Sequence, residues 1–304
     1  MGTVLTYFQA IILGLIQGIS ELFPISSLGQ TVILPSLFGW KRLVALQAST
    51  HHSFFLSFLV ALHVGTAVAL LIYFRKDGSR IMGAVLRSAA RRRIETPDER
   101  LGWLLVVATI PAGLVGLAFE KLLRVLFATP LAAAVFLVLN GIILLVGDAA
   151  RRASEQRAAR LARRAARAGR QVGATDHRQL DTLEFKEAVV IGVAQVLALF
   201  AGISRSGITM VAGLLRGMNH EDSARFSFLL ATPIIFAAGV YKLPELMSPL
   251  AAHVRSQALV GGVVAGIAAY FSTGFLLRWF ETKKLWPFAL YCLVFGTAMV
   301  VNFA

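Results

Sequence analysis

The chain has 304 residues, of which 57% are hydrophobic and only 15% are charged, and its formal net charge at neutral pH is +14. A soluble domain of this length could not hide so much apolar surface in its core, so the composition excludes the soluble class and predicts a polytopic membrane protein. The positive charge is typical of cytoplasmic loops that lie near anionic lipid headgroups. We expect no binding of nucleic acid, because no nucleic-acid module is visible in the sequence.

The first apolar segment covers about residues 4 to 40 and is interrupted by the polar pair Ser26 and Ser27. We therefore predict a re-entrant helical hairpin there. Three uninterrupted apolar stretches follow, each long enough as a helix to cross a hydrocarbon core of about 30 Å. These predicted spans cover about residues 53 to 74, 102 to 119 and 130 to 147.

A basic stretch rich in Ala and Arg, residues 148 to 185, separates the first half of the chain from the second. Ala and Arg favour helix, so this stretch predicts a partly helical cytoplasmic linker. A second interrupted segment, about residues 187 to 218, predicts another re-entrant hairpin. Three further spans are predicted at about residues 225 to 243, 256 to 277 and 286 to 303.

The two interrupted segments are copies of each other. Matching positions hold Gly14 and Gly192, Gln17 and Gln195, Ser26 and Ser204, Gly29 and Gly207, and Thr31 and Thr209. Broken hydrophobic segments at corresponding places in two halves indicate the binding site of a membrane protein. The predicted fold is therefore all-α, with two inverted-topology repeats, residues 1 to 147 and 186 to 304, each a re-entrant hairpin plus three transmembrane helices.

The topology follows from the number of crossings. A hairpin returns to the side it entered, and three spans then carry the chain across, so the second repeat is inverted relative to the first. Most Lys and Arg residues outside the spans fall in residues 75 to 101, 148 to 185 and 278 to 285. The positive-inside rule places these segments in the cytoplasm. Both termini and the mouth of the first hairpin are then expected to face outward.

The two copies differ at chemically important positions. Gln17 and Glu21 share one face of a helix, and a carboxylate inside a membrane indicates a functional site. In the second copy Leu199 replaces Glu21, and Arg205 replaces Ser27. If both turns meet, the site combines an acid, several hydroxyls, a guanidinium and two helix N-termini. Such a site suits a phosphate or diphosphate.

Less specific interpretations remain open for several of these residues. Glu21 could serve only as the counter-ion of Arg205. The serines of both turns, Ser26, Ser27, Ser204 and Ser206, could be helix N-caps. Gly29 and Gly207 fit tight turns or close helix packing. The histidines His51, His52 and His63 have no convincing partners in the sequence, and we expect them to be loop and packing residues.

The run QGISELFPISSLGQ from Gln17 to Gln30 resembles the (E/Q)xxxE…PxSSxGH signature of bacterial undecaprenyl-diphosphate phosphatases, and AGISRSGIT from Ala201 to Thr209 resembles their PGxSRSxxT signature. The resemblance implies a multi-pass enzyme of the bacterial inner membrane with its active site facing the periplasm or outside. It would hydrolyse undecaprenyl diphosphate to undecaprenyl phosphate and phosphate. That reaction recycles the lipid carrier for peptidoglycan synthesis and underlies bacitracin resistance.

The resemblance also suggests roles for individual residues. The expected catalytic residues are Glu21, Ser27 and Arg205, and Glu21 with Gln17 is expected to bind a divalent cation, magnesium or calcium. Expected substrate contacts are Gln17, Ser26, Gly29, Gln30, Ser204, Ser206, Gly207 and Thr209. Whether Ser27 or water attacks the phosphorus stays open. The expected partners are the polyprenyl diphosphate and membrane lipids, and we also allow for a homodimer.

Two positions depart from the signatures. Ala201 replaces a Pro, and Gln30 replaces a His that is thought to act in proton transfer. Gln cannot titrate, so either activity is reduced, or Glu21 or a metal-bound water moves the proton, or the protein moves the lipid without hydrolysing it. The main alternative function is therefore a polyprenyl-phosphate transporter or flippase, and a second is a small-anion or drug-resistance permease.

Overall fold

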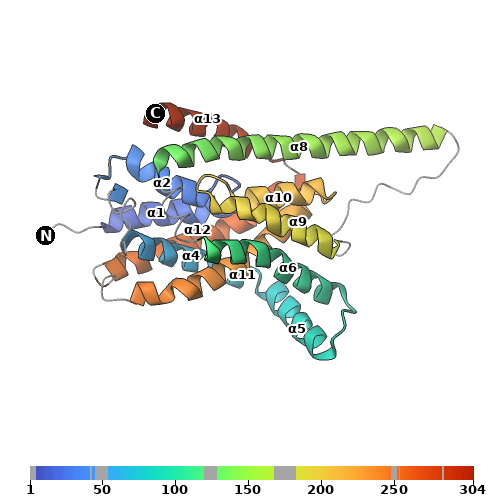
Figure 1. The fold of residues 1–304 in the computed structure, drawn as a ribbon, viewed down its shortest axis with the longest axis horizontal. Helices are drawn as coiled ribbons and strands as arrows, with labels where there is room; N and C mark the ends of the chain where they lie inside the picture. The colour runs from blue at the N-terminus through green and yellow to red at the C-terminus, as the bar shows by residue number, and fades with distance from the viewer. Residues whose placement is uncertain are drawn as a thin grey trace.

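The structure is a computed structural model that describes residues 5–41, 43–44, 54–119, 129–167, 183–247, 252, 254–282 and 284–304. Within these ranges every regular element is a helix (Figure 1), which confirms the predicted all-α class. The helices are α1 (Tyr7–Ser20), α2 (Ser27–Leu37), α4 (Phe54–Tyr73), α5 (Arg75–Arg91), α6 (Pro97–Ala118), α8 (Pro130–Arg167), α9 (Phe185–Gln195), the 3-10 helix η2 (Val196–Leu199), α10 (Arg205–Leu215), α11 (His220–Met247), α12 (Arg255–Thr282) and α13 (Trp286–Phe303).

The long apolar helices confirm a multi-pass membrane protein. In the described part of the chain, α6, α8, α11, α12 and α13 are each long and apolar enough to cross a membrane. A sixth candidate is the pair of α4 and α5, which is bent by 84° at its break. All six stretches predicted as spans coincide with these helices, and the two predicted hairpins coincide with the shorter helices α1, α2, α9 and α10.

Several helices extend beyond the predicted spans, and two differences from the prediction are large. The span predicted to end at residue 147 continues as α8 to Arg167, because the basic stretch that follows is built of helix formers and contains no Gly or Pro before that point. Residues 168–182 of the predicted linker lie outside the described residues. The second difference is α5, a helix within the segment that the sequence indicated only as a cytoplasmic connection.

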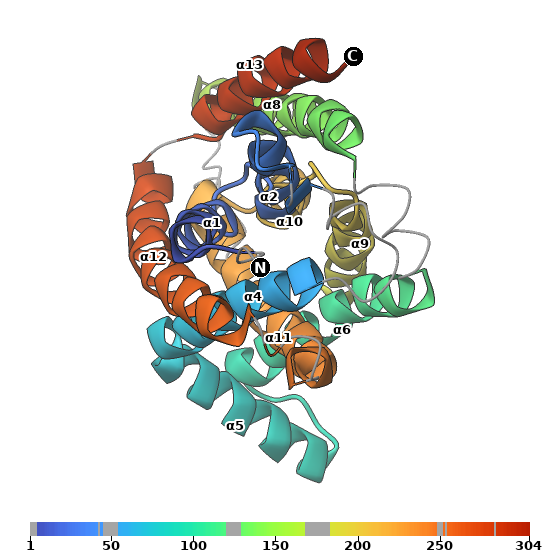
Figure 2. The same cartoon turned by 90° about the vertical axis from the view of Figure 1, so that its left-hand side faces the viewer.

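The elements of the two interrupted segments lie in the centre of the molecule. Figure 2, viewed along the bundle, shows α1, α2 and α10 inside a ring formed by α4, α6, α8, α9, α11, α12 and α13, with α5 outside it. Helix α1 packs tightly on α12, since a Cβ on Gly14 would lie 2.5 Å from the carbonyl oxygen of Gly261. Glycine at this position therefore lets the two backbones approach.

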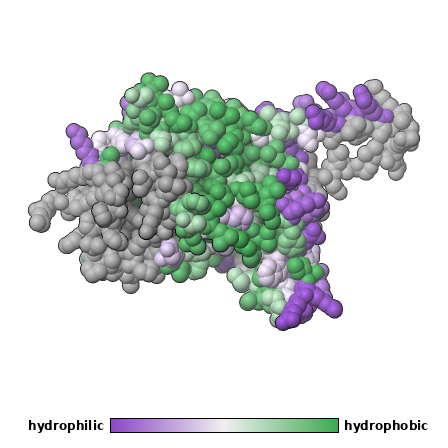
Figure 3. All heavy atoms as spheres, viewed as in Figure 1, coloured by the Kyte–Doolittle hydropathy of each residue, from purple (hydrophilic) through white to green (hydrophobic). Residues whose placement is uncertain are grey.

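The surface is divided between an apolar belt and a hydrophilic end. Figure 3 shows hydrophobic side chains over the middle of the bundle and hydrophilic ones towards α5 and the distal part of α8. The first described helix begins, and α13 ends, at the opposite end of the bundle (Figure 1). The belt is the surface that a bilayer would cover.

Candidate active site

The turns of the two interrupted segments meet at the N-termini of α2 and α10. Ser26 and Ser204 are the N-caps of these helices, and their hydroxyls accept hydrogen bonds from the backbone N–H groups of Gly29 and Gly207, each at 3.2 Å. This is the capping role that the sequence left open. The Ser26 hydroxyl also accepts a hydrogen bond, 3.1 Å long, from the N–H of Gly202 in the other turn.

The contact between the turns depends on unusual backbone geometry. A Cβ on Gly29 would lie 3.0 Å from Cα of Gly202, so a side chain there would push the two turns apart. Gly202 itself has φ +110°, a conformation that residues with a side chain rarely adopt. Ser26 has φ +64° although it is not glycine. Strain of this kind costs on the order of 1–3 kcal/mol and is typical of functional sites.

Asn140 of α8 ties both turns together. Its side-chain amide donates a hydrogen bond of 2.9 Å to the carbonyl of Pro24, while its Oδ1 accepts one of 2.9 Å from the N–H of Ser204. Asn140 is fully buried. The sequence patterns above did not predict this residue, although an uncharged polar residue within an apolar span is a signal that could have found it.

The expected catalytic residues come together around Glu21, which caps the C-terminus of α1 and is 7% exposed. Its Oε1 accepts a hydrogen bond of 3.0 Å from Nη2 of Arg205. Its Oε2 accepts one of 2.9 Å from Nε2 of Gln17 and one of 2.6 Å from the hydroxyl of Ser27. We call these four residues the Glu21 cluster.

The Glu21 cluster joins the two copies of the repeated segment, since Arg205 is the first residue of α10 and the other three belong to the first hairpin. The carboxylate and the guanidinium offset each other's charge in a poorly solvated place. A guanidinium has five N–H donors in a planar fork. Among the described residues the guanidinium of Arg205 donates to Glu21 and, from Nη1 over 3.5 Å, to the carbonyl of Ser227. Its fork can therefore also hold an oxyanion.

His63 corrects one of the expectations from the sequence. Its Nε2 lies 3.7 Å from Oε2 of Glu21, so His63 faces the cluster and the expectation that it only packs was wrong. Its Nδ1 lies 2.8 Å from the carbonyl oxygen of Leu59 in the same helix. A lone imidazole within an otherwise uncharged span was the signal in the sequence. His51 and His52 lie outside the described residues.

Several expected substrate contacts make hydrogen bonds to the protein instead. Gln30 donates to the carbonyl of Ile25 at 3.2 Å and accepts from the hydroxyl of Tyr291 at 3.1 Å, so its amide is engaged on both sides. The hydroxyls of Ser206 and Thr209 are bonded to Phe23 O and to Ser227 Oγ, respectively. These bonds connect the three side chains to Phe23, Ile25, Ser227 and Tyr291, and their role as substrate contacts stays a prediction.

The described residues do not fit a resident divalent ion held by Glu21 and Gln17. No group of three or more His, Cys, Asp or Glu side chains with suitable spacing occurs in the described part of the chain. Glu21 is the single carboxylate of the cluster, and a guanidinium already offsets its charge. Gln17 has a buried Oε1 without a hydrogen-bond partner, which offers one neutral ligand. A doubly charged ion next to Arg205 would meet electrostatic repulsion at this point.

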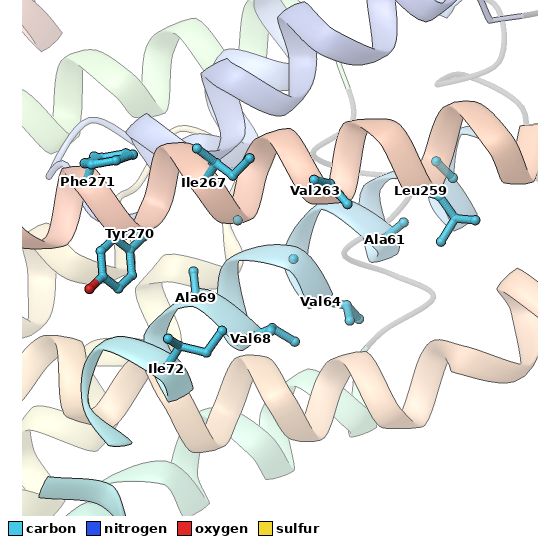
Figure 4. Close-up of a pocket in the computed structure, with 14 residues that line it drawn as sticks. Ala61, Val64, Val68, Ala69, Ile72, Leu259, Val263, Ile267, Tyr270 and Phe271 are labelled. Atoms are coloured by element: carbon cyan, nitrogen blue, oxygen red, sulfur yellow. The ribbon is translucent and has the colours of Figure 1, made fainter. Parts of the chain in front are cut away.

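An apolar groove of about 480 Å³ lies between α4 and α12 (Figure 4). Its walls include Ala61, Val64, Val68, Leu259, Val263 and Phe271. No member of the Glu21 cluster lines the groove, but His63 belongs to the same helix as one of its walls. The groove suits a hydrocarbon chain, because apolar side chains dominate its surface.

Comparisons with known proteins show that the chain is similar to one protein family. The family model described as bacitracin resistance protein BacA matches residues 10–298. Undecaprenyl-diphosphatase 2 of Frankia alni is 52% identical over 99% of this chain and 98% of its own length. Undecaprenyl-diphosphatase of Mycolicibacterium paratuberculosis is 51% identical over 98% and 97% of the two chains, and undecaprenyl-diphosphatase 2 of Chromobacterium violaceum is 44% identical over 95% of each.

Proposed function

The chain belongs to the bacitracin resistance protein BacA family, and we propose that it is an integral membrane phosphatase that hydrolyses undecaprenyl diphosphate to undecaprenyl phosphate and inorganic phosphate. Relatives with this activity in their names match nearly the whole chain, which supports the same activity here. The reaction would return the lipid carrier to cell-wall synthesis and so support cell shape and resistance to bacitracin.

The observation that carries the proposal is the hydrogen bond of 2.6 Å from the Ser27 hydroxyl to Glu21. A serine hydroxyl is a weak nucleophile unless a neighbouring base takes its proton. Glu21 is such a base, and Gln17 holds the same carboxylate oxygen in place at 2.9 Å. In our proposal Ser27 attacks the terminal phosphorus. The alignment of its hydroxyl with a base favours hydrolysis over transport, because a transporter does not need a nucleophile.

The charge that spreads over the phosphoryl oxygens would be stabilised by Arg205. Its guanidinium sits at the N-terminus of α10, where the helix dipole also favours negative charge. Phosphoryl transfer depends mainly on positioning and electrostatic stabilisation, so a fixed cation beside the nucleophile supplies the main requirement. The α4–α12 groove is apolar enough to take part of the polyprenyl chain.

We propose that a magnesium or calcium ion, where the reaction uses one, enters with the diphosphate. Divalent ions of this kind are commonly held by substrate phosphates together with few protein ligands. Within the Glu21 cluster, Oε1 of Gln17 is buried without a hydrogen-bond partner, so it would be the protein ligand of such an ion. When bound, the ion would neutralise negative charge on the phosphates.

We also propose the finer architecture: two inverted repeats, 1–147 and 186–304, whose re-entrant hairpins enter from opposite faces. The contact between Ser26 and Gly202 supports it, since it brings equivalent turns of both segments together in the core. The gathering of hydrophilic residues around α5 and the distal part of α8 supports a cytoplasmic location for that end (Figure 3). Both termini and the entrance to the active site would then face outward.

Purified protein in detergent, assayed for phosphate release from undecaprenyl or farnesyl diphosphate with and without magnesium, tests the proposed activity. We expect phosphate release that the Ser27→Ala variant loses. Binding of the diphosphate lipid without any phosphate release would refute the phosphatase and favour the flippase.

A further inference from the structure

His63 lies beside the Glu21 cluster, and the proposed function assigns it no role so far. Within α4 no other side chain can carry a charge at neutral pH, and Nε2 of this one lies 3.7 Å from Oε2 of Glu21. Ionisable residues within membrane segments are costly and tend to be functional. The role inferred below rests on the proposed phosphatase activity.

The contacts of the imidazole determine which of its nitrogens is free. Nδ1 lies 2.8 Å from the carbonyl oxygen of Leu59, and a carbonyl can only accept, so the hydrogen bond places a proton on Nδ1. Nε2 then faces Oε2 of Glu21 at 3.7 Å. Two acceptors that face each other repel unless a proton lies between them. The arrangement is therefore suited to one proton that either Glu21 or His63 carries.

One oxygen atom connects this pair to the nucleophile. Oε2 of Glu21 accepts the hydrogen bond from Ser27 and is also the oxygen that faces His63. The side chain of Glu21 is 6% exposed, whereas that of His63 is 30% exposed. His63 is thus the member of this row that reaches the protein surface. Ser27, Glu21 and His63 form a row along which a proton can leave the buried site.

The histidine expected from the family signature cannot serve this purpose, because Gln30 stands in its place and its amide is bonded to Ile25 and Tyr291. The imidazole reaches the site from α4 instead. The charged neighbours agree with this role. Arg205 is the other charged group at Glu21, and the sequences of α11 between Arg225 and Lys242 and of α12 between Arg255 and Arg278 contain no charged residue.

We propose that His63 receives, through Glu21, the proton that Ser27 loses when it attacks the terminal phosphorus. The Ser27 oxygen forms a bond to phosphorus, and the bond to the bridging oxygen breaks, so the polyprenyl phosphate leaves with that electron pair. The proton of the hydroxyl moves to Oε2 of Glu21 and then to Nε2 of His63. The distance of 3.7 Å must shorten for this transfer, and catalytic contacts commonly tighten when substrate binds.

The second step restores the enzyme. Water forms a bond to the phosphorus of the phosphoserine, and the bond between that phosphorus and Ser27 breaks. One proton of the water returns to the Ser27 oxygen through Glu21, and the other stays on the released phosphate. His63 gives its proton to bulk water, so each turnover releases one proton, as hydrolysis of a diphosphate near neutral pH requires.

The test compares the native enzyme with His63→Gln and His63→Asn. Gln keeps a polar group near the position of Nε2 and Asn keeps one near Nδ1, but neither can take up a proton. His220→Gln is the matched control, because His220 also faces a carboxylate, Asp148, at 3.0 Å but lies outside the site. We would measure kcat and KM for phosphate release from farnesyl diphosphate between about pH 5 and pH 9, and Tm in detergent.

We expect both His63 variants to keep Tm and KM and to lose roughly 100-fold in kcat, a usual contribution of general acid–base catalysis. The fall in kcat towards acidic pH should be present in the native enzyme and in His220→Gln and absent from both His63 variants. A His63→Gln enzyme that keeps its rate or its acid limb would overturn the inference while leaving the phosphatase intact. A native enzyme that releases no phosphate would instead overturn the proposed function itself.

Discussion

Nη2 of Arg205 lies 3.0 Å from Oε1 of Glu21, although 184 residues separate the two in the sequence. The pair joins the two copies of the repeated segment at the place where the copies differ most in chemistry. Its side chains are 13% and 6% exposed. Removing one partner leaves the other charge buried and unpaired, so variants at these positions must separate effects on catalysis from effects on folding.

The Arg205→Lys variant keeps the charge but loses the planar fork. The guanidinium reaches Glu21 with Nη2 and the carbonyl of Ser227 with Nη1, and a single ammonium cannot reproduce both contacts and also hold a phosphate. We expect kcat/KM to fall at least roughly tenfold, which corresponds to about 1.4 kcal/mol of transition-state stabilisation. Steady-state phosphate release from correctly folded protein measures it. Unchanged kinetics would remove Arg205 from the active site.

The Glu21→Gln variant tests the base. Gln is nearly isosteric with Glu, but it cannot take the proton of the Ser27 hydroxyl, and its single side-chain oxygen can replace only one of the two carboxylate oxygens that accept from Ser27 and from Arg205. We expect Tm in detergent to be largely retained, binding of a diphosphate lipid analogue to be retained or weakened, and turnover to be lost.

Loss of activity together with a large fall in Tm would mean that the variant disrupts the ion pair rather than the chemistry. Measurable turnover in a stable Glu21→Gln protein would show that another group accepts the proton.

The Gly202→Ala variant tests the contact between the two turns. At φ +110° a Cβ is strained, and it would also meet the backbone of Ala133 and Cβ of Phe136. We expect a lower Tm and reduced activity. Gly113→Ala is the matched control, since nothing lies within 4 Å of its Cβ position and Ala favours helix by up to about 1 kcal/mol. Equal thermal midpoints for the two variants would show that the turns do not need to approach closely.

Single cysteines at the two ends of the bundle test the orientation. Lys41 and Ala153 are exposed, and the native Cys292 is buried, so the native chain should label poorly with a membrane-impermeant thiol reagent. We expect Lys41→Cys to label from outside intact cells and Ala153→Cys to label only after the cells are opened. The reverse pattern would invert the proposed topology.

The repeat in the sequence led to much of the candidate site, and the rest came from helices outside the repeat. Matching the two copies identified Glu21, Ser27 and Arg205, because a carboxylate and a guanidinium at non-equivalent positions of similar segments are conspicuous. His63 and Asn140 contact the same region from α4 and α8. The length of an apolar stretch predicts that a helix spans the membrane, but it does not say which face of the helix meets another helix, so the contacts of these two residues could not be predicted.

The boundaries of the helices show the same limit. Hydropathy predicted where each span lies, since the length of apolar sequence is fixed by the thickness of the bilayer. It could not predict that α8 continues to Arg167 or that α5 turns by 84° from α4, because both segments are polar and lie beyond the apolar stretches. Helix propensity did predict a partly helical linker after this span, in agreement with the extension of α8, but it does not give the direction of α5.

The Gln30→His variant distinguishes two ways in which this chain could do without the histidine of the family signature. If the native protein lacks a proton-transfer group, a histidine at position 30 should raise kcat and introduce a new dependence on pH. If His63 already moves the proton, the added imidazole should change kcat by less than about threefold, against the 100-fold or more that a missing general base commonly costs. The bonds of Gln30 to Ile25 and Tyr291 favour the second outcome, because a side chain at position 30 is already held at both ends of its amide by groups other than Glu21. The combined variant Gln30→His with His63→Gln completes the comparison. We expect this double variant to recover part of the lost kcat only if the side chain at position 30 can turn towards Ser27. Adding Tyr291→Phe removes the hydroxyl that bonds to position 30 and should then increase the recovery.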